Sequence, residues 1–261
     1  MVVKSKVVSE HVGDLGNIFE ILRKHKLHLN TSKCSFGVEL DKFLGYMVTH
    51  WGIEVNPDQI KAINNLQPPQ NLKEVQKLIE MTAALNRFIS RSADRCRPFF
   101  LLMNKWKRFE WTEECTLAFQ QLKEYLSHPP IMSNPEVDEI LFAYIAMAPH
   151  AVSLVLIRVD SGIQQPVYHV SKLLHEAEVR YLPLEKAILA IVHGTQKFPH
   201  YFQAHTIVVL TQLSIKAILR SADHTGRIAK WSTILGAFDI KYMTSYLCQG
   251  PGPCRPGGRF R

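Results

Sequence analysis

The architecture of this chain is set by residues 139–171, which read EILFAYIAMAPHAVSLVLIRVDSGIQQPVYHVS. The stretch contains three apolar runs, at about 139–147, 151–159 and 164–171, rich in the β-branched and aromatic residues that favour strands. The last two runs are separated by Asp160-Ser161-Gly162, a sequence typical of a tight hairpin turn. The sequence therefore predicts three strands in an antiparallel meander.

The residues after the meander alternate between helical and strand patterns. Ile188, Ile191 and Val192 share one face of a predicted helix over roughly 181–197. The further elements expected are a strand over 206–211, a helix near 213–220 and a last strand around 237–243. The predicted order is β-β-β-α-β-α-β, so this part of the chain belongs to the α/β class.

The residues ahead of the meander read as mostly helical. Leu15, Ile18, Phe19 and Leu22 have the spacing of an amphipathic helix over 10–26. The other predictions are a strand with a tight turn over 42–48, a short helix from Pro57, a helix over 72–86 capped by Asn71, and a helix from Thr112 to the Pro129-Pro130 pair. We expect these elements to form a small helical unit.

Composition limits the class of protein and its partners. With 46% hydrophobic and 21% charged residues, the 261-residue chain can bury a core, and its length suits two domains. The net charge of +8 favours contact with polyanions such as nucleic acid, although many unrelated proteins carry as much. Charge alone therefore does not assign a partner.

The five cysteines are odd in number and contain no C-x-x-C pair, so the sequence favours neither a disulfide framework nor a zinc site. No apolar run is long enough to span a membrane, and the N-terminus lacks a signal-peptide pattern. We expect a soluble, intracellular protein, cytoplasmic or nuclear. No phosphate-binding glycine loop occurs, so no nucleotide cofactor is implied.

Several short sequence motifs follow one another in a specific order over residues 1 to about 245. They are Leu29-Asn30 with Lys33-Cys34 and Phe36, Phe43-Leu44-Gly45, Gly52-Ile53 with Pro57, Arg87-Phe88-Ile89, Phe109-Glu110-Trp111, Ala177-Glu178 with Tyr181, and Leu184-Glu185-Lys186. In this order they resemble the Pol polyprotein of Ty3/gypsy retrotransposons, from just past the polymerase active site through the RNase H domain. The words at 201–205 and 230–231 are most similar to plant members.

The resemblance implies a reverse transcriptase piece followed by an RNase H-like domain. The family's Tyr-x-Asp-Asp polymerase motif would lie just upstream of Met1, and residues 1–60 contain no replacement, so we expect no polymerase activity. Residues 43–46, Phe43-Leu44-Gly45-Tyr46, match the turn that supports the primer strand in relatives. The alternative is that Phe43 and Leu44 simply pack in a core.

RNase H chemistry in relatives uses clustered carboxylates to hold two Mg²⁺ ions. The first aspartate of that set corresponds to Ala146, and the aspartate after the fourth strand corresponds to Gln212. The glutamate of the first helix matches Glu185, which could equally have a surface or salt-bridge role. Neither a methyl group nor a neutral amide is a good Mg²⁺ ligand. We therefore expect no metal site and no bound cofactor, in contrast to active relatives.

The last aspartate of relatives lies in a stretch resembling K-G-Q-V-L-A-D-L near the C-terminus. Here residues 249–258 instead read QGPGPCRPGG, and we interpret residues 248–261 as a disordered Pro/Gly tail, possibly the same nucleotides read out of frame. A natural disordered tail is the alternative.

Basic residues are the remaining functional signal. The candidates for nucleic-acid contact are Phe43, Leu44, Gly45, Tyr46, Lys73, Lys77, Arg87, Lys105 and Trp106. Lys105 and Trp106 combine a cation with an aromatic ring, as strand-binding surfaces do. A solvated lysine-rich helix face is the alternative interpretation.

The sequence thus predicts an α/β protein with three parts. They are a palm-end and thumb remnant over 1–104, an RNase H-like domain with a mixed five-stranded sheet over 105–247, and the tail. We expect a catalytically inactive retrotransposon fragment that acts as a structural tether or remnant within its Pol polyprotein. The alternatives are a non-catalytic module that binds an RNA/DNA hybrid or template-primer duplex, and a residual hybrid ribonuclease.

Overall fold

The computed structural model describes residues 3, 5, 8–30, 34, 41–43, 46–49, 52–103, 109–220 and 226–243. The chain divides into two compact units, residues 1–41 and 42–261. Across the described residues, no helix is both long and apolar enough to cross a membrane. The tail at 248–261 and the cysteines Cys248 and Cys254 lie outside the described residues.

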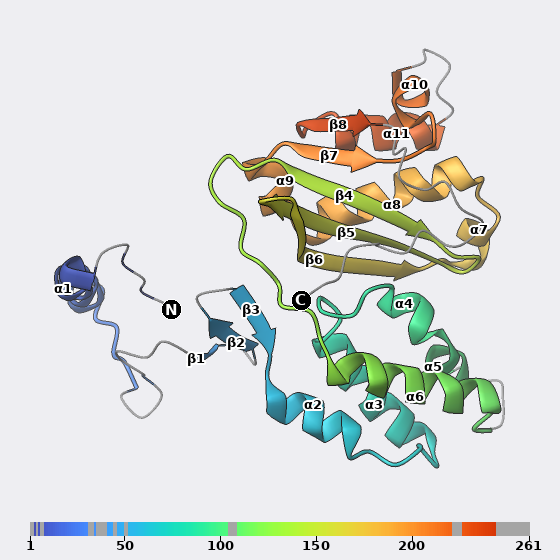
Figure 1. Ribbon diagram of the computed structural model, residues 1–261, viewed down its shortest axis with the longest axis horizontal. Helices are drawn as coiled ribbons and strands as arrows, with labels where there is room; N and C mark the ends of the chain where they lie inside the picture. The colour runs from blue at the N-terminus through green and yellow to red at the C-terminus, as the bar shows by residue number, and fades with distance from the viewer. Residues whose placement is uncertain are drawn as a thin grey trace. The chain divides into compact units, whose positions relative to one another are not determined.

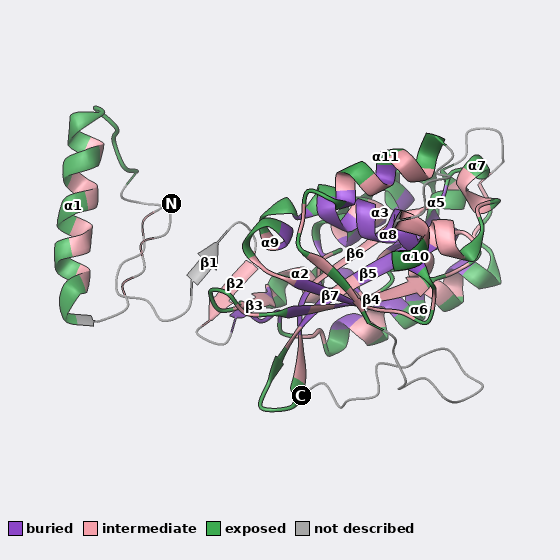
Figure 2. Cartoon of the chain, turned by 90° about the horizontal axis from the view of Figure 1, so that it is seen from above, coloured by how far each residue is buried: buried purple, intermediate pink, exposed green. Residues whose placement is uncertain are grey.

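The described residues of the first unit include one long helix. A 3₁₀ turn, η1 (Val8–Glu10), leads into α1 (His11–Lys24), which confirms the helix predicted over 10–26. No residue of α1 is buried, and Val12 and Ile21 are 79% and 56% exposed. Figure 2 shows this helix in the colours of exposed and intermediate residues along its whole length.

The second unit contains the mixed five-stranded sheet that the sequence predicted (Figure 1). Its strands are β4 (Leu141–Met147), β5 (Ala151–Asp160), β6 (Ile163–Leu173), β7 (Ile207–Leu210) and β8 (Ile240–Met243). They lie in the order β6-β5-β4-β7-β8. The meander β4-β5-β6 is antiparallel, whereas β7 pairs in parallel with both β4 and β8.

In the described part of the chain, five helices accompany this sheet. They are α7 (Glu176–Val179), α8 (Pro183–Lys197), α9 (Pro199–Ala204), α10 (Ile215–Arg220) and α11 (Gly226–Leu235). Helix α8 packs against β4, β5 and β6 and buries its middle turns, because every residue from 187 to 192 is apolar. The sequence interpretation missed α7, α9 and α11. For α11 the signal was present, since Ile228, Trp231 and Leu235 have helical spacing and face the core.

The part ahead of the sheet combines a small sheet with helices. The strands β1 (Asp41–Phe43), β2 (Tyr46–Thr49) and β3 (Gly52–Val55) form a three-stranded sheet. The helices are α2 (Pro57–Asn64), α3 (Leu72–Ala84), α4 (Ser92–Arg95), α5 (Arg97–Leu102) and α6 (Glu113–Ser127). The side chain of Asn71 accepts a hydrogen bond from the Glu74 N–H at 3.0 Å, as expected of an N-cap. The sequence interpretation missed β3, α4 and α5.

Two hydrophobic cores lie in this second unit. One contains buried residues between Val55 and Met132, and the other contains buried residues between Leu141 and Leu235. Helix α6 packs in the first core through Cys115, Phe119 and Leu122. The expected domain boundary between residues 104 and 105 lies outside the described residues. Along the chain, the first core ends at Met132 and the second begins at Leu141.

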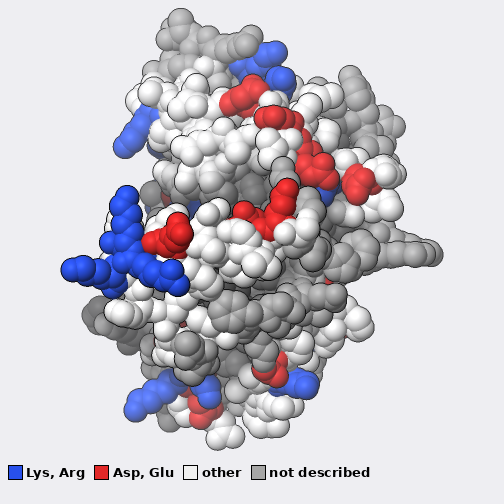
Figure 3. Space-filling view, turned by 90° about the vertical axis from the view of Figure 1, so that its left-hand side faces the viewer, with Lys and Arg blue, Asp and Glu red and all other residues white. Residues whose placement is uncertain are grey.

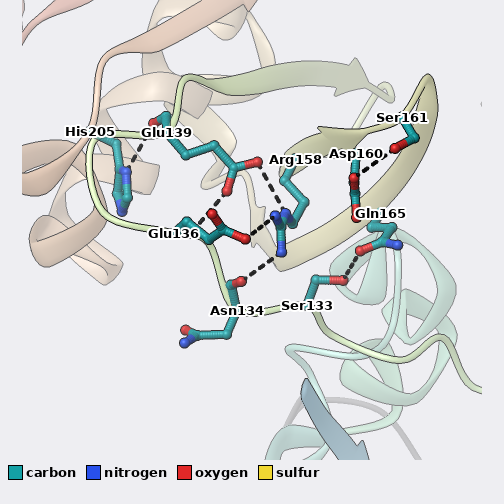
Figure 4. A network of polar contacts seen from close by, with 9 residues as sticks. All are labelled: Ser133, Asn134, Glu136, Glu139, Arg158, Asp160, Ser161, Gln165 and His205. Carbon is teal, nitrogen blue, oxygen red and sulfur yellow. Dashed lines mark hydrogen bonds and ion pairs between the residues drawn. The ribbon is translucent and has the colours of Figure 1, made fainter. Parts of the chain in front are cut away.

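The segment that connects the two cores is anchored to the sheet through Arg158 of β5 (Figure 4). The Arg158 guanidinium donates to the Asn134 carbonyl at 3.0 Å and pairs with Glu139 at 3.0 Å and Glu136 at 3.4 Å. The side chains of Arg158 and Glu139 are 15% and 17% exposed, whereas Glu136 is 80% exposed. His205 adds a 3.0 Å hydrogen bond between its Nδ1 and the Glu139 carbonyl.

The two carboxylates that pair with Arg158 should differ sharply in their contribution to stability. Replacing Glu139 by Gln should lower the free energy of unfolding by about 2 kcal/mol, because it leaves a mostly buried guanidinium without its closest charge partner. The matched change Glu136→Gln should alter it by less than about 0.5 kcal/mol, since that pair is solvent-screened. Urea unfolding measures both, and equal effects would contradict the anchoring role of Glu139.

Candidate functional site

Ala146 and Gln212, the positions at which the sequence resemblance predicts aspartates, lie at the same end of the sheet. The parallel pairing of β4 with β7 matches Tyr144 to Leu210, and Ala146 and Gln212 each come two residues later. Carboxyl ends of adjacent parallel strands lie side by side, so the two positions are level with each other. The strand pairing therefore places the two positions at one end of the sheet, and neither carries a carboxylate.

Glu185 lies at the start of α8, near the end of β4. The neighbouring Lys186 Nζ donates to the Pro149 carbonyl at 3.1 Å, which joins the first turn of α8 to the turn after β4. One Glu185 oxygen accepts the Leu182 N–H at 3.0 Å and thereby caps the helix. The other lies 3.7 Å from the Arg227 guanidinium. Glu185 thus has the helix-capping and ion-pair contacts of a structural carboxylate.

Other acids of the sheet have partners of their own. Asp160 accepts a hydrogen bond from the Ser161 hydroxyl at 3.1 Å at the tip of the β5–β6 hairpin. Asp239 accepts one from the Thr206 hydroxyl at 2.5 Å. Asp223 lies outside the described residues.

The donor set at this end of the sheet does not fit the Mg²⁺ ions of active relatives. Ala146 offers a methyl group and Gln212 a neutral amide, and the carboxylate of Glu185 already has two partners. Within the described ranges, no group of three His, Cys, Asp or Glu side chains converges in a way that could hold a metal ion. Mg²⁺ requires several oxygen ligands, most of them anionic.

The turn quoted as Phe43-Leu44-Gly45-Tyr46 is only partly described. Strand β1 ends at Phe43 and β2 begins at Tyr46, while Leu44 and Gly45 lie outside the described residues. The Tyr46 hydroxyl donates to the Ala84 carbonyl at 3.2 Å, and its ring lies 5.6 Å from that of Phe88. Tyr46 therefore packs on the helical core at the end of α3.

Arg87 joins the helical part to the sheet. Its guanidinium carbon lies 4.7 Å from the ring centroid of Tyr168 on β6 and 5.2 Å from that of Tyr46. The Arg87 carbonyl accepts the His169 N–H at 3.3 Å. Its Nε is buried without a hydrogen-bond partner in the described structure. Cation–π contacts thus stabilise this side chain. Through them Arg87 connects β2 with β6.

Lys73 and Lys77 lie one turn apart on the exposed face of α3. Both side chains are therefore open to solvent and available to an anionic partner. Lys105 and Trp106 lie outside the described residues. On the face of the molecule in Figure 3, one cluster of Lys and Arg side chains lies at the left edge, and most Asp and Glu side chains lie apart from it toward the upper right.

Comparison with known families locates one match within the chain. Residues 111–209 match the family described as "RNase H-like domain found in reverse transcriptase". These residues run from the start of α6 to β7.

Relatives with curated descriptions cover nearly the whole chain. One is the "Retrovirus-related Pol polyprotein from transposon 297" of Drosophila melanogaster, 27% identical over 92% of this chain and 23% of the relative. Another is the "Transposon Tf2-3 polyprotein" of Schizosaccharomyces pombe, 25% identical over 92% of this chain and 18% of the relative. The chain thus spans about a fifth of the length of these polyproteins.

Solved structures share the fold. A foamy viral protease-reverse transcriptase in complex with an RNA/DNA hybrid superposes with a TM-score of 0.78 at 19% identity, over 97% of this chain and 36% of that one. A second, in complex with double-stranded DNA, has a TM-score of 0.76 over 95% of this chain and 45% of that one. The chain therefore has a reverse transcriptase/RNase H-like fold and is similar to the RNase H-like region of retrotransposon Pol polyproteins.

Proposed function

We propose that this chain is the reverse transcriptase–RNase H region of a Ty3/gypsy-type Pol polyprotein from a plant, with no catalytic activity of its own. The plant assignment rests on the sequence words at 201–205 and 230–231. The observation that carries the inactivity is the loss of carboxylates at Ala146 and Gln212, together with the engagement of Glu185 by Leu182 and Arg227. The free, buried thiols of Cys96 and Cys115 favour an intracellular location, cytoplasmic or nuclear.

The role left for such a chain is that of a structural tether between the helical part and the downstream polyprotein. Several contacts hold the helical part firmly to β6. The Ser171 hydroxyl lies 2.7 Å from the Ser92 hydroxyl and accepts the Ala93 N–H at 2.7 Å. The Ser133 hydroxyl donates to Gln165 at 2.8 Å. Together with Arg87, these contacts support a rigid connection.

Purified, folded protein should cleave a labelled RNA/DNA hybrid in Mg²⁺ no faster than a protein-free control. The reason is that hydrolysis by this fold needs two metal ions held by carboxylates, and the loss of one ligand is already damaging. An active RNase H serves as the positive control, and circular dichroism verifies folding. Cleavage that disappears in Glu185→Gln would overturn the proposal.

A second candidate function is binding of a template-primer duplex without chemistry. It is supported by the exposed pair Lys73 and Lys77 and by neighbours solved in complex with an RNA/DNA hybrid and with double-stranded DNA. Such binding would weaken steeply with salt, because lysine–phosphate contacts release counterions.

A further inference from the structure

A surface pocket of about 450 Å³ opens beside Gln212, at the end of the sheet where β7 and β8 terminate. Residues 211–214, 216 and 217, from the end of β7 into α10, form one side, and Tyr242 and Met243 of β8 form the other. In Figure 1 these elements lie together at the top of the view. The pocket thus adjoins the position of a replaced carboxylate.

The lining of this pocket favours an anion. Among the described residues that line the pocket, Lys216 is the charged one and none is a carboxylate. Gln212, Ser214 and Tyr242 add an amide and two hydroxyl groups that can donate hydrogen bonds. Burial raises the pKa of Tyr242 to about 12, so its hydroxyl keeps its proton at neutral pH. One amide and two hydroxyl groups therefore line the pocket as potential donors, together with the positive charge of Lys216.

The replacement of aspartate by Gln212 changes what this end of the sheet can bind. In active relatives a carboxylate here would repel a phosphate, and a metal ion must lie between the two. Here the amide of Gln212 carries no charge, and the remaining Glu185 is paired with Arg227. A phosphate can therefore approach Lys216 directly, without a bridging cation.

We propose that the pocket between α10 and β8 binds a phosphate group of a nucleic-acid strand directly, with Lys216 as the charge partner and no metal ion. This inference rests on the proposed function, because it makes the degenerate nuclease site a metal-independent strand-binding site. Where active relatives hydrolyse the bond at a bound phosphate, this chain would bind a phosphate of the strand without cleaving it.

The test is binding of a fluorescent RNA/DNA hybrid to the whole chain in EDTA, measured by anisotropy across a salt series. Lys216→Gln should lower the slope of log affinity against log salt by about 1, the value for one lost phosphate contact. The matched control is Lys241→Gln, an exposed lysine of β8 next to Tyr242 that does not line the pocket, and it should keep the wild-type slope. A wild-type slope in Lys216→Gln, or binding that requires Mg²⁺, would overturn the inference.

Met243 supplies a second readout inside the pocket. With methyl-labelled methionine, its NMR signal is assigned by its loss in Met243→Leu, and it should shift when the hybrid is added in EDTA. A shift with inorganic phosphate alone, but none with the hybrid, would overturn the assignment to a nucleic-acid strand. Neither outcome bears on hybrid cleavage, so failure here is distinguishable from failure of the proposed function.

Discussion

Gly52→Ala is expected to lower the free energy of unfolding by about 3 kcal/mol or more. An alanine Cβ at this position would lie 2.0 Å from the Met132 carbonyl oxygen, and the glycine has a φ of +147°. That oxygen accepts the Ile53 N–H at 2.8 Å, and the Met132 N–H returns a 2.9 Å bond to the Ile53 carbonyl. The substitution must therefore break the pairing between β3 and the segment after α6, besides straining its own backbone.

Gly226→Ala is the matched control for this substitution. Gly226 begins α11, and a Cβ there meets nothing within 4 Å, so its replacement should change stability by less than about 1 kcal/mol. Urea unfolding followed by tryptophan fluorescence measures both variants. Wild-type stability in Gly52→Ala would show that β3 does not approach Met132 as closely as described.

The double replacement of Ala146 and Gln212 by Asp should create a metal dependence that the wild-type chain lacks. In EDTA the variant should melt below wild type, because two new carboxylates near Glu185 repel one another. Excess Mn²⁺ should reverse this. At a concentration of about 100 times Kd it adds about 2.7 kcal/mol, or a rise in Tm on the order of 5–10 °C.

The control for the double variant carries asparagine at both positions, which matches the size of aspartate without its charge. It should melt at the same temperature in EDTA and in Mn²⁺. Thermal unfolding followed by circular dichroism gives the comparison. If the aspartate variant shows no metal-dependent shift, the positions do not converge with Glu185, and the correspondence with the relatives' ligand set is wrong.

Much of the fold was predictable because its signals are local. The three strands of the meander have apolar, β-branched runs and a glycine turn, and Asn71 and Thr112 cap the helices that they were expected to begin. The short helices α4, α5 and α9 were missed, since four to six residues carry little periodicity. Strand β3 was missed because its pairing depends on β2 and on Met132, which is distant in sequence.

The candidate site was predictable in part. Ala146 and Gln212 could be located by counting from neighbouring motifs, and the pairing of Tyr144 with Leu210 places both positions at the same end of the sheet. The sequence allowed a salt-bridge role for Glu185, but it did not identify Arg227 as the partner, because α11, which carries Arg227, was itself missed. The correspondence of these residues with a relative's ligand set stays a prediction.

Residue chemistry and local spacing were enough to establish the α/β class, the order of the main strands and the absence of carboxylates at two positions. Those properties depend on side-chain type and on neighbours within a few residues. Only the tertiary structure shows that Arg87 lies between Tyr46 and Tyr168. The same is true of the ion pair between Glu185 and Arg227 and of the pocket lined by Lys216. Each of these depends on residues that are distant in sequence, and their proximity follows from how the strands pair and the helices pack.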